Sequence, residues 1–427
     1  MSSNNETNNA IGIHLATQLD ALTADLGSQS KTFNEYVRAS ASAHLPGDPS
    51  AEVQAAKEKL LEDALQIFNL VSGPTEYIQN VLIGCHYMEI LRWMSHFKIF
   101  ELVPLESKIS YSELAAKAGV TEERLKSLAR MAMTSSLFTE PVRGYMAHST
   151  TSAALLTNQG LASFRRWITA VTGPAAASMV KAHARWPDNT APNRTAFSAA
   201  FDTDLGMYEY IAMKPDIYRL FDTAMQAVAK SPMSHLKHLI SGFDWASLGK
   251  ATVVDVGGNV GHSCVELAKA FHDLDFIVED TPQVVEEGIK TVKANDPTLA
   301  ERIKFQEYDF FTKQPVQGAQ VYLLRQILHN WNFDKAVEIT KNTAASMGED
   351  SHILIMDMLL PEPGSVSSVQ ERVLRSRDVV MMQLFNSLER DLEGWQEIFT
   401  AADPRLRINA VNKPEGSFLT VIDVVKG

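Results

Sequence analysis

The second half of the chain alternates short apolar runs with amphipathic helical stretches. Four of these runs have the length of a strand, and they lie at residues 251–256, 276–278, 321–324 and 353–356. Strands that are apolar along their whole length are buried on both faces, which is typical of a parallel sheet covered by helices. Residues 407–425 have the pattern of a closing hairpin. We therefore expect a doubly wound α/β domain over residues 241–427.

The first half of the chain has helical periodicity and little that alternates like a strand. Residues 60–72 carry apolar side chains at steps of three and four, which indicates an amphipathic helix. Residues 81–100 are more apolar and are expected in a core or a subunit interface. The sequence predicts a helical domain over residues 13–240, preceded by a flexible polar tail over residues 1–12.

Residues 109–125 have the pattern of a helix-turn-helix. Gly119 is expected to end the first helix and Thr121 to cap the second. Many such units bind DNA, but this one has four basic and three acidic side chains, so its net charge is only +1. They are Lys117, Arg124, Lys126 and Arg130 against Glu113, Glu122 and Glu123. The near-neutral charge favours a structural winged-helix module over a DNA-binding one.

The composition narrows the range of partners. The chain has 39 basic and 51 acidic residues, a net charge of −12, which disfavours nucleic-acid phosphates and anionic membrane surfaces. Its two cysteines, Cys85 and Cys264, cannot build a disulfide framework or a cysteine zinc site, and no metal-ligand cluster is evident. We find no secretory signal pattern and no run of the roughly 18 apolar residues of a membrane helix. We expect a cytoplasmic protein without a metal, a nucleic-acid partner or a membrane partner.

A glycine-rich turn follows the first apolar strand. Gly257, Gly258 and Gly261 stand where that strand ends and a helix begins. Glycines there let the backbone approach a ligand closely, and the helix amides point at it. The spacing differs from the G-x-G-x-x-G of pyrophosphate binders, and Asp280 ends the next strand about 20 residues on, where a carboxylate can bind ribose hydroxyls. The pattern favours a nucleoside cofactor without a pyrophosphate over a nicotinamide dinucleotide.

Five motifs follow one another along the chain. They are Val-Asp-Val-Gly-Gly (254–258), Glu-Asp-Thr-Pro-Gln-Val (279–284), Tyr-Asp-Phe-Phe (308–311), Leu-Arg-Gln-Ile-Leu-His-Asn-Trp (324–331) and Leu-Glu-Arg (388–390). The ordered set resembles the plant and fungal small-molecule O-methyltransferases of the caffeate and flavonoid type, over about residues 60–427. The resemblance implies an N-terminal all-α winged-helix dimerisation domain and a Rossmann-like class I methyltransferase domain. It also implies S-adenosylmethionine as cofactor, a homodimer, and a small aromatic or polyketide-like acceptor from fungal secondary metabolism.

The same resemblance assigns the cofactor contacts. Gly257 and Gly258 are expected to face the amino-acid end of the cofactor, and Asp280 to hold its ribose. Asp309 and Phe310 are expected at the adenine. Judged by sequence alone, Phe310 is equally well explained as a core residue.

Three further candidates lie in the motif 324–331. Arg325 stands where the family has Lys or Arg beside the cofactor, and Trp331 is expected near the adenine, although it too is explained equally well by core packing. His329 occupies the position of the family's general base. Methyl transfer from a sulfonium needs a deprotonated phenol or enol, and histidine has a pKa suited to removing that proton. A lone histidine after an apolar run is otherwise most often a structural residue.

Two acids match the residues that support this base in the family. Asp357 follows the strand 353–356, and Glu389 lies in the last motif. A carboxylate bound to one imidazole nitrogen fixes the tautomer and stabilises the charge that the ring acquires. From the sequence alone, without the resemblance, each of these two acids is well explained as a solvated surface residue.

The acceptor wall is expected on the helix before Glu389. The candidates at helical spacing are Met381, Met382, Phe385 and Asn386. Methionine suits a yielding wall around a flat ligand, but ordinary core packing explains the same pattern. His148 and Trp167, from the front half, are further candidates.

The sequence departs from the family at a few positions. Asn259 stands where the family usually has a third glycine, and asparagine tolerates a positive φ better than most residues. Thr281 replaces a common leucine, and residues 387–391 replace a Gly-Lys-Glu-Arg-Thr pattern. These changes affect the acceptor side more than the cofactor side.

A different reaction class fits the same fold. Some fungal relatives bind S-adenosylmethionine but catalyse pericyclic reactions or dehydrations in polyketide–alkaloid pathways, with the positive sulfur as an electrostatic element. In that case Arg325 and His148 would polarise the substrate. The complete set of His329, Asp357 and Glu389 favours methyl transfer. A cofactor-binding regulator without turnover is the third alternative.

Overall fold

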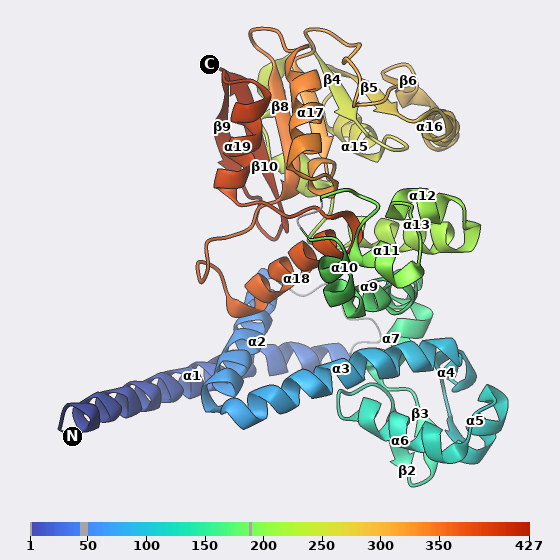
Figure 1. Cartoon of the computed structure of the whole chain (residues 1–427), viewed down its shortest axis with the longest axis vertical. Coiled ribbons are helices and arrows are strands. Elements are labelled where there is room, and N and C mark those ends of the chain that lie inside the picture. Colours follow the sequence, from blue (N-terminus) through green and yellow to red (C-terminus); the bar gives the residue numbers. More distant parts are fainter. Residues whose placement is uncertain (1, 43–49, 188–189) are drawn as a thin grey trace. The chain divides into compact units, whose positions relative to one another are not determined.

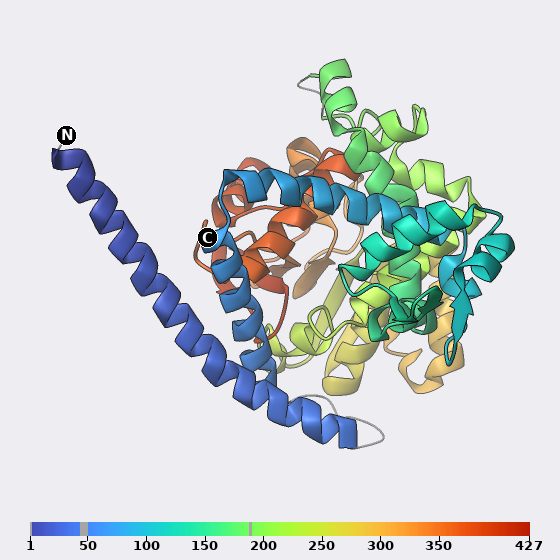
Figure 2. The same cartoon turned by 90° about the horizontal axis from the view of Figure 1, so that it is seen from below.

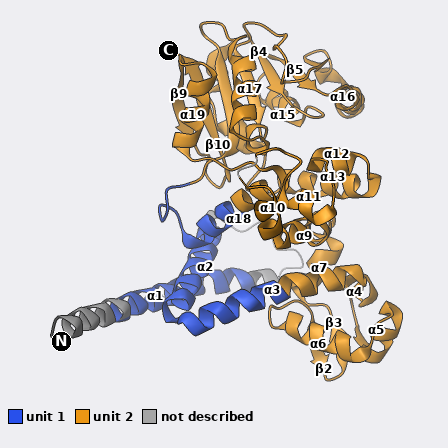
Figure 3. Cartoon of the chain, in the orientation of Figure 1, with its two compact units in different colours: residues 1–86, 361–376 blue, residues 87–360, 377–427 orange. Residues whose placement is uncertain are grey.

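The computed structural model describes the backbone of residues 2–42, 50–187 and 190–427 (Figure 1). The chain divides into a first unit of residues 1–86 and 361–376 and a second unit of residues 87–360 and 377–427 (Figure 3). The predicted domain boundary at residue 240 does not separate these units, because the second unit holds residues from both sides of it.

The first unit is helical. It contains α1 (Ser2–Ser42), α2 (Ala51–Val71), the first part of α3 (Pro74–His96) and the start of α18 (Ser368–Phe385). α1 is one continuous helix (Figure 2). The backbone is helical from Ser2, which the sequence did not predict; Met1 lies outside the described residues, and the flexibility of residues 1–12 stays a prediction. This polar, asparagine-rich stretch has no apolar periodicity, which is the main signal for a helix in a sequence.

The second unit begins with a small module around the predicted helix-turn-helix. After α4 (Ile99–Leu102) come α5 (Tyr111–Ala118) and α6 (Glu122–Met133). The predicted caps are confirmed, since Gly119 has φ 69° and the Thr121 side chain accepts a hydrogen bond from the amide of Arg124. A three-stranded antiparallel sheet with the order β1-β3-β2 completes the module. Its strands are β1 (Lys108–Ser110), β2 (Thr139–Val142) and β3 (Tyr145–Ala147).

The front half is mainly helical, as expected, and these three short strands were not predicted. The three strands have only three or four residues each, and β2 is largely exposed. Strands this short cannot show the alternation of apolar and polar residues from which strands are recognised.

A group of short helices connects this module to the large sheet. They are α7 (Thr150–Thr157), α8 (Gln159–Trp167), the π-helical turn η1 (Ile168–Thr172), α9 (Gly173–Ala177), α10 (Met179–Arg185), α11 (Ala196–Phe201), α12 (Met207–Ala212), α13 (Pro215–Ala229), α14 (Lys237–Ser241) and the 3₁₀ turn η2 (Trp245–Leu248). Their apolar side chains form a core around Trp167 and Phe197. Leu384 and Phe385 of α18 belong to the same core, so the predicted acceptor helix packs against the front half of the chain.

The predicted α/β domain is confirmed as a seven-stranded mixed sheet with the order β6-β5-β4-β7-β8-β10-β9. Its strands are β4 (Ala251–Val256), β5 (Leu274–Asp280), β6 (Ile303–Glu307), β7 (Val321–Arg325), β8 (His352–Met358), β9 (Leu406–Asn412) and β10 (Leu419–Lys426). β4 to β8 are parallel, while β10 pairs antiparallel with both β8 and β9. The last two strands are the predicted hairpin.

Helices cover both faces of this sheet. They are α15 (His262–Ala270), α16 (Pro282–Asn295), α17 (Phe333–Ala344) and α19 (Leu392–Ala402), with the 3₁₀ turns η3 (Pro297–Leu299) and η4 (Leu328–Asn330). Val253 packs with α15 on one face and Val254 with α17 and α19 on the other, so successive residues of β4 are buried on opposite sides. This burial on both faces explains the continuous apolar runs in the sequence.

The order of the strands determines where a ligand can bind. The chain runs outward from β4 to β6 and then returns to the other side of β4 to form β7. In open α/β sheets a crevice forms at this reversal, at the carboxyl ends of the strands. Gly257, Asp280, Arg325 and Asp357 all lie at that edge, at or just after the ends of β4, β5, β7 and β8.

Candidate active site

The glycine turn after β4 is held by the neighbouring strand. The amides of Gly257 and Gly258 both donate to the carbonyl oxygen of Glu279, at 2.8 and 3.1 Å. Gly257 has φ 72°, and a Cβ atom on Gly258 would lie 2.6 Å from the Oδ2 atom of Asp255. Both positions therefore require glycine.

Asp280 is fixed beside this turn. Its Oδ2 atom accepts a hydrogen bond from the amide of Asn259 at 2.9 Å, and its Oδ1 atom accepts one from the amide of Thr281 at 2.7 Å. Asn259 has φ 54°, so it adopts the left-handed conformation expected for a residue that replaces glycine. The structure thus brings the two predicted cofactor elements, the turn and the carboxylate, into direct contact.

An aromatic wall stands next to the turn. The rings of Phe310 and Trp331 lie 5.7 Å apart at 77°, and those of Phe311 and Trp331 lie 4.8 Å apart at 87°. Phe310 also lies within 3.8 Å of the position that a Cβ atom on Gly257 would take. Asp309 begins this segment, and its side chain accepts a hydrogen bond from the amide of Phe311. Phe311 was not predicted as a site residue, although it ends the motif 308–311.

Phe310 and Trp331 belong to a core cluster of the large sheet. Both are partly buried and pack against the apolar core on the α17 and α19 face of the sheet. Phe310 also lies beside the glycine turn, and its ring contacts that of Trp331. The core interpretation and the site interpretation are therefore compatible for these two residues.

A second acid lies below the turn. Asp255 is buried, accepts a contact from the thiol of Cys264 at 3.5 Å, and has its pKa raised to about 6 by burial. Arg325 interacts electrostatically with both Asp255 and Asp357, and one of its terminal nitrogens donates to the carbonyl of Ser234 at 3.1 Å. Burial lowers the pKa of Arg325, and the two acids oppose that effect. Sequence reasoning missed Asp255, whose apolar neighbours gave it the appearance of a strand residue.

His329 lies on η4, immediately after β7. Its Nδ1 atom is 3.0 Å from the Oε1 atom of Glu389, and the two side chains are 15% and 2% exposed. The backbone amide of Glu389 donates to Asp378 at 2.8 Å, which fixes the glutamate in turn. A carboxylate on Nδ1 selects the tautomer in which Nε2 is the nitrogen that can take a proton from another molecule.

Asp357 completes the group. It is the last residue but one of β8 and is 1% exposed, and neither of its carboxylate oxygens has a hydrogen-bond partner among the residues that the structure describes. Burial raises the pKa of Asp357 to about 7, against the opposing effect of His329. The structure brings His329, Asp357 and Glu389 together from three different segments.

The two acids determine the protonation of the histidine. Burial by itself would lower the pKa of His329, but the charges of Glu389 and Asp357 outweigh it and raise the pKa to about 9. At neutral pH the ring therefore carries a proton in this state, and it has to lose that proton before it can act as a base.

The predicted acceptor wall lies at the end of α18. Phe385 packs against Tyr208, with ring centroids 5.2 Å apart at 32°, while Met381 and Met382 are half-buried. The side-chain amide of Asn386 donates to the carbonyls of Ala191 and Arg194, at 2.8 and 3.1 Å. Asn386 thus fixes a neighbouring loop, and the apolar side chains before it are the better candidates for contact with an acceptor.

The two front-half candidates take part in structural contacts. His148 has one ring nitrogen 2.9 Å from Ser152 and the other 3.1 and 3.2 Å from the carbonyls of Phe100 and Val103. None of these contacts involves the carboxyl edge of the large sheet, so the prediction of His148 in the acceptor cavity gains no support. Trp167 is 3% exposed and packs against Phe221, within the core that also holds Phe385.

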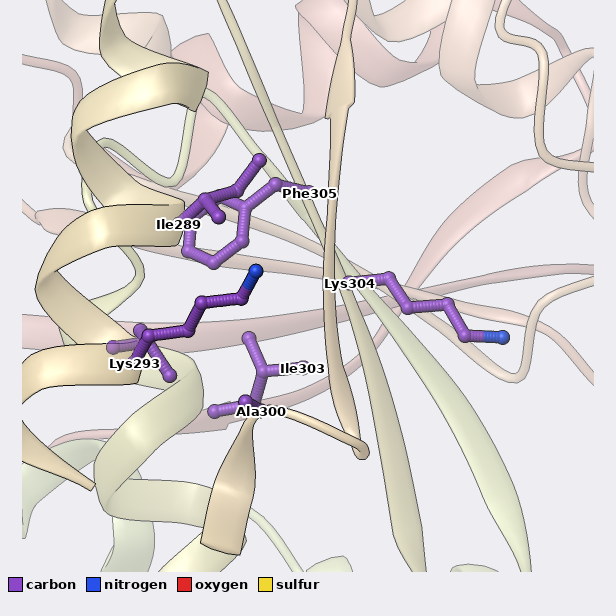
Figure 4. A pocket seen from close by; sticks show the side chains of 7 residues that line it. Ile289, Lys293, Ala300, Ile303, Lys304 and Phe305 are labelled. Atoms are coloured by element: carbon purple, nitrogen blue, oxygen red, sulfur yellow. The ribbon is translucent and has the colours of Figure 1, made fainter. Parts of the chain in front are cut away.

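A pocket lies between α16 and the edge strand β6 (Figure 4). It is lined by Ile289, Val292, Lys293, Ala300, Ile303, Lys304 and Phe305. None of these residues was predicted to belong to a site. Among the described residues, no cluster of His, Cys, Asp and Glu could hold a metal ion, and no helix is both long and apolar enough to span a bilayer.

Comparison with known proteins agrees with this geometry. The model of the O-methyltransferase domain family matches residues 184–403. The O-methyltransferase bik3 of Gibberella fujikuroi is 64% identical over 421 residues, which cover 96% of this chain and 93% of that protein. The O-methyltransferase aoiF of Aspergillus oryzae is 41% identical over 415 residues, which cover 96% of this chain and 97% of that protein.

Solved structures share the fold at lower identity. OxaC superposes with a TM-score of 0.74 and 22% identity, over 96% of this chain and all of that chain. LepI in complex with SAM has a TM-score of 0.69 and 22% identity, over 92% and 97% of the two chains. A protein described as a pericyclic reaction enzyme has a TM-score of 0.68 and 23% identity, over 92% and 97%. The family model and the closely similar relatives agree, and the chain belongs to the O-methyltransferase family of enzymes.

Proposed function

We propose that the protein transfers the methyl group of S-adenosylmethionine to a phenol or enol hydroxyl of a small aromatic or polyketide-like secondary metabolite, with His329 as the general base. The observation that carries this proposal is the 3.0 Å contact between Nδ1 of His329 and Glu389 at the carboxyl edge of the sheet. It leaves Nε2 as the nitrogen that can accept the hydroxyl proton.

The residues present suit S-adenosylmethionine. The glycine turn follows β4 at the carboxyl edge of the sheet, where the amino-acid end of the cofactor is proposed to bind. Side chains at Gly257 and Gly258 would displace the turn, because they would collide with Ile327 and Asp255. Asp280 is held at the end of β5, where a carboxylate can bind both ribose hydroxyls. When bound, this cofactor supplies a methyl group activated by its sulfonium charge.

The adenine is assigned to the aromatic wall. Phe310 and Trp331 offer ring surfaces beside the turn, and Asp309 begins the same segment. Arg325 interacts electrostatically with Asp255, which lies in β4 just before the turn, and would lie near the amino-acid end of the cofactor.

His329 takes the hydroxyl proton of the acceptor onto Nε2. Glu389 and Asp357 then stabilise the positive charge of the imidazole, as their effect on the pKa of His329 indicates. Most of the rate enhancement would come from holding the hydroxyl oxygen of the acceptor in line with the methyl group, since orientation can lower the activation barrier by roughly 7–11 kcal/mol. Met381, Met382 and Phe385 are proposed as the apolar wall that orients the acceptor, next to the loop that Asn386 fixes.

A pericyclase or dehydratase is the second candidate. It is favoured by the fold shared with a pericyclic reaction enzyme and by the buried Nε atom of Arg325, which has no hydrogen-bond partner among the described residues. His148, the second residue that such a mechanism would use, is occupied by carbonyl groups and Ser152. The complete base with its two acids supports methyl transfer instead.

We also propose a homodimer, in which residues 13–240 form the winged-helix and dimerisation domain and residues 241–427 the catalytic domain. The first unit exposes large apolar side chains on α2 and α3. They include Leu61, Phe68, Val71, Tyr77, Ile78, Val81 and Leu82, which are 48–68% exposed. Apolar side chains gathered on two consecutive helices are typical of a subunit interface. Because Cys85 and Cys264 are both free thiols, we propose a reducing, cytoplasmic location.

The direct test uses S-adenosylmethionine labelled in its methyl group, incubated with the protein and an extract of phenolic and polyketide metabolites. Label in an organic-soluble product supports methyl transfer and supplies the acceptor for identification. Conversion of an extract component without label, dependent on the cofactor, would favour the pericyclase instead.

A further inference from the structure

The segment that carries His329 has little structure of its own. η4 comprises only Leu328–Asn330, and it follows Gln326, which has φ 55° although it is not a glycine. The turn is closed by two long backbone hydrogen bonds, from Asn330 to Ile327 at 3.2 Å and from Trp331 to Leu328 at 3.1 Å. Short 3₁₀ turns have poor hydrogen-bond geometry, so the position of the His329 ring has to be determined by other contacts.

Two side chains after α18 supply these contacts. The Oγ atom of Ser387 lies 2.6 Å from the carbonyl oxygen of His329 and 2.8 Å from that of Trp331, so its one hydroxyl proton can be donated to either carbonyl. The guanidinium of Arg390 donates to the carbonyls of Leu328 and Trp331, at 2.9 and 2.6 Å. One short loop thus binds the carbonyls of Leu328, His329 and Trp331. The same loop carries Glu389, which contacts the His329 ring.

This loop is itself well anchored. Ser387 is 1% exposed and Arg390 9% exposed, and the guanidinium lies 5.3 Å from the ring of Trp395. The carbonyl of Arg390 accepts a hydrogen bond from Leu360 at 2.9 Å, which ties the loop to the chain just after β8. The planar fork of arginine suits two carbonyl groups at once, and lysine cannot reproduce it.

We propose that Ser387 and Arg390 are positioning residues for catalysis, which hold the segment 328–331 so that the His329 ring faces Glu389. Neither residue takes part in the proton transfer. The proposal rests on the proposed role of His329 as the base, but it concerns the place of the ring and can be tested without any substrate.

The test follows the His329 ring by NMR in the full-length protein, labelled on its 12 histidines and assigned with the His329→Ala variant. In the wild type we expect a titration midpoint near 9, since Glu389 and Asp357 raise the pKa of His329 to about 9. In Ser387→Ala the midpoint should fall by roughly one unit, because a loosened ring loses part of its interaction with Glu389. Ser387 carries no charge before or after the change, so such a shift reports geometry alone.

Arg390→Lys is the second variant, with Arg302→Lys as its matched control. Lysine keeps the charge near His329 but loses the fork, so Arg390→Lys should also lower the midpoint. Arg302 similarly binds carbonyl groups, those of Ala268, Phe271 and Leu274, at the opposite end of the sheet. Arg302→Lys should lower the melting temperature and leave the His329 midpoint unchanged.

The outcomes separate the two proposals. If folded Ser387→Ala and Arg390→Lys both titrate like the wild type, the positioning role is wrong, whatever the role of His329. An equal shift in Arg302→Lys would overturn it as well, because the effect would then be general loosening. The role of His329 as the base is decided separately, by turnover of His329→Ala.

Discussion

The Oε1 atom of Glu389 lies 3.0 Å from Nδ1 of His329, although the two residues are 60 positions apart in the sequence. The contact joins the turn after β7 to the loop between α18 and α19. It assigns separate roles to the two ring nitrogens, one bound to the protein and the other available to a substrate hydroxyl. It also links the activity of the base to the charge of a buried carboxylate.

The first prediction concerns pH. Because Glu389 and Asp357 raise the pKa of His329 to about 9, the base is mostly protonated at neutral pH and becomes active as the pH rises. We expect kcat/KM for the identified acceptor to increase roughly tenfold per pH unit between about 7 and 8.5 and to level off above 9. The groups that act on the ring are Glu389, Asp357 and Arg390, of which Arg390 lowers its pKa. A profile that is flat or falling between pH 7 and 9 would contradict this account.

Replacing the supporting acid should lower both the rate and the pH at which the rate levels off. Glu389→Gln keeps the shape of the side chain but removes the negative charge, so the imidazolium formed during the reaction is less stable. We expect kcat to fall by roughly 10- to 100-fold, and the rise of the rate with pH to occur at lower pH than in the wild type.

The matched control for this variant is Asp423→Asn. Asp423 forms a similar pair with His352, at 2.7 Å, but His352 begins β8 and therefore lies at the opposite end of the sheet from Asp357. This variant should keep the wild-type kcat. Equal losses in the two variants would show that Glu389 acts only through general stability.

The glycine turn provides a prediction about cofactor binding. A Cβ atom on Gly258 would lie 2.6 Å from Asp255 and 2.9 Å from Val278, so Gly258→Ala has to displace the turn. We expect the affinity for S-adenosylmethionine, measured by calorimetry, to fall roughly tenfold or more, about 1.4 kcal/mol. Gly348→Ala is the control, because its Cβ atom would meet only ordinary contacts at 3.6 Å or more. Wild-type affinity in Gly258→Ala would remove the turn from the cofactor site.

The proposed homodimer can be tested by sedimentation. The chain has a mass of 47.2 kDa, and we expect a species of twice that mass in the wild type. Ile78→Asp places a charge on the exposed apolar surface of α3 and should shift the protein toward the monomer. Val180, which is 83% exposed on α10, is the control position, and Val180→Asp should leave the mass unchanged. A wild-type protein that sediments as a monomer would refute the dimer.

Much of the large sheet was predictable because its strands are buried on both faces. Such strands appear as continuous apolar runs, and the glycines and acids at their ends mark the edge where a ligand binds. The caps at Gly119 and Thr121 were predictable for a similar reason, since left-handed and capping positions restrict the residue type. In both cases the signal is local in the sequence.

The remaining features depend on contacts between distant segments. Ser387 and Arg390 bind backbone carbonyls 56 to 62 positions away, and a carbonyl gives no residue-type signal at its own position. The contacts of His148 with the carbonyls of Phe100 and Val103 are of the same kind, and the sequence contains no signal for them. β1 to β3 were missed because strands of three or four residues are too short for a periodic pattern.

The central claim is tested most directly by the turnover of His329→Ala with methyl-labelled S-adenosylmethionine and the identified acceptor. The account predicts a rate lower by roughly 10²- to 10⁴-fold, with cofactor affinity close to that of the wild type. His352→Ala, which removes a histidine from the opposite end of the sheet, should retain the wild-type rate. Wild-type turnover in His329→Ala would remove this histidine from the mechanism.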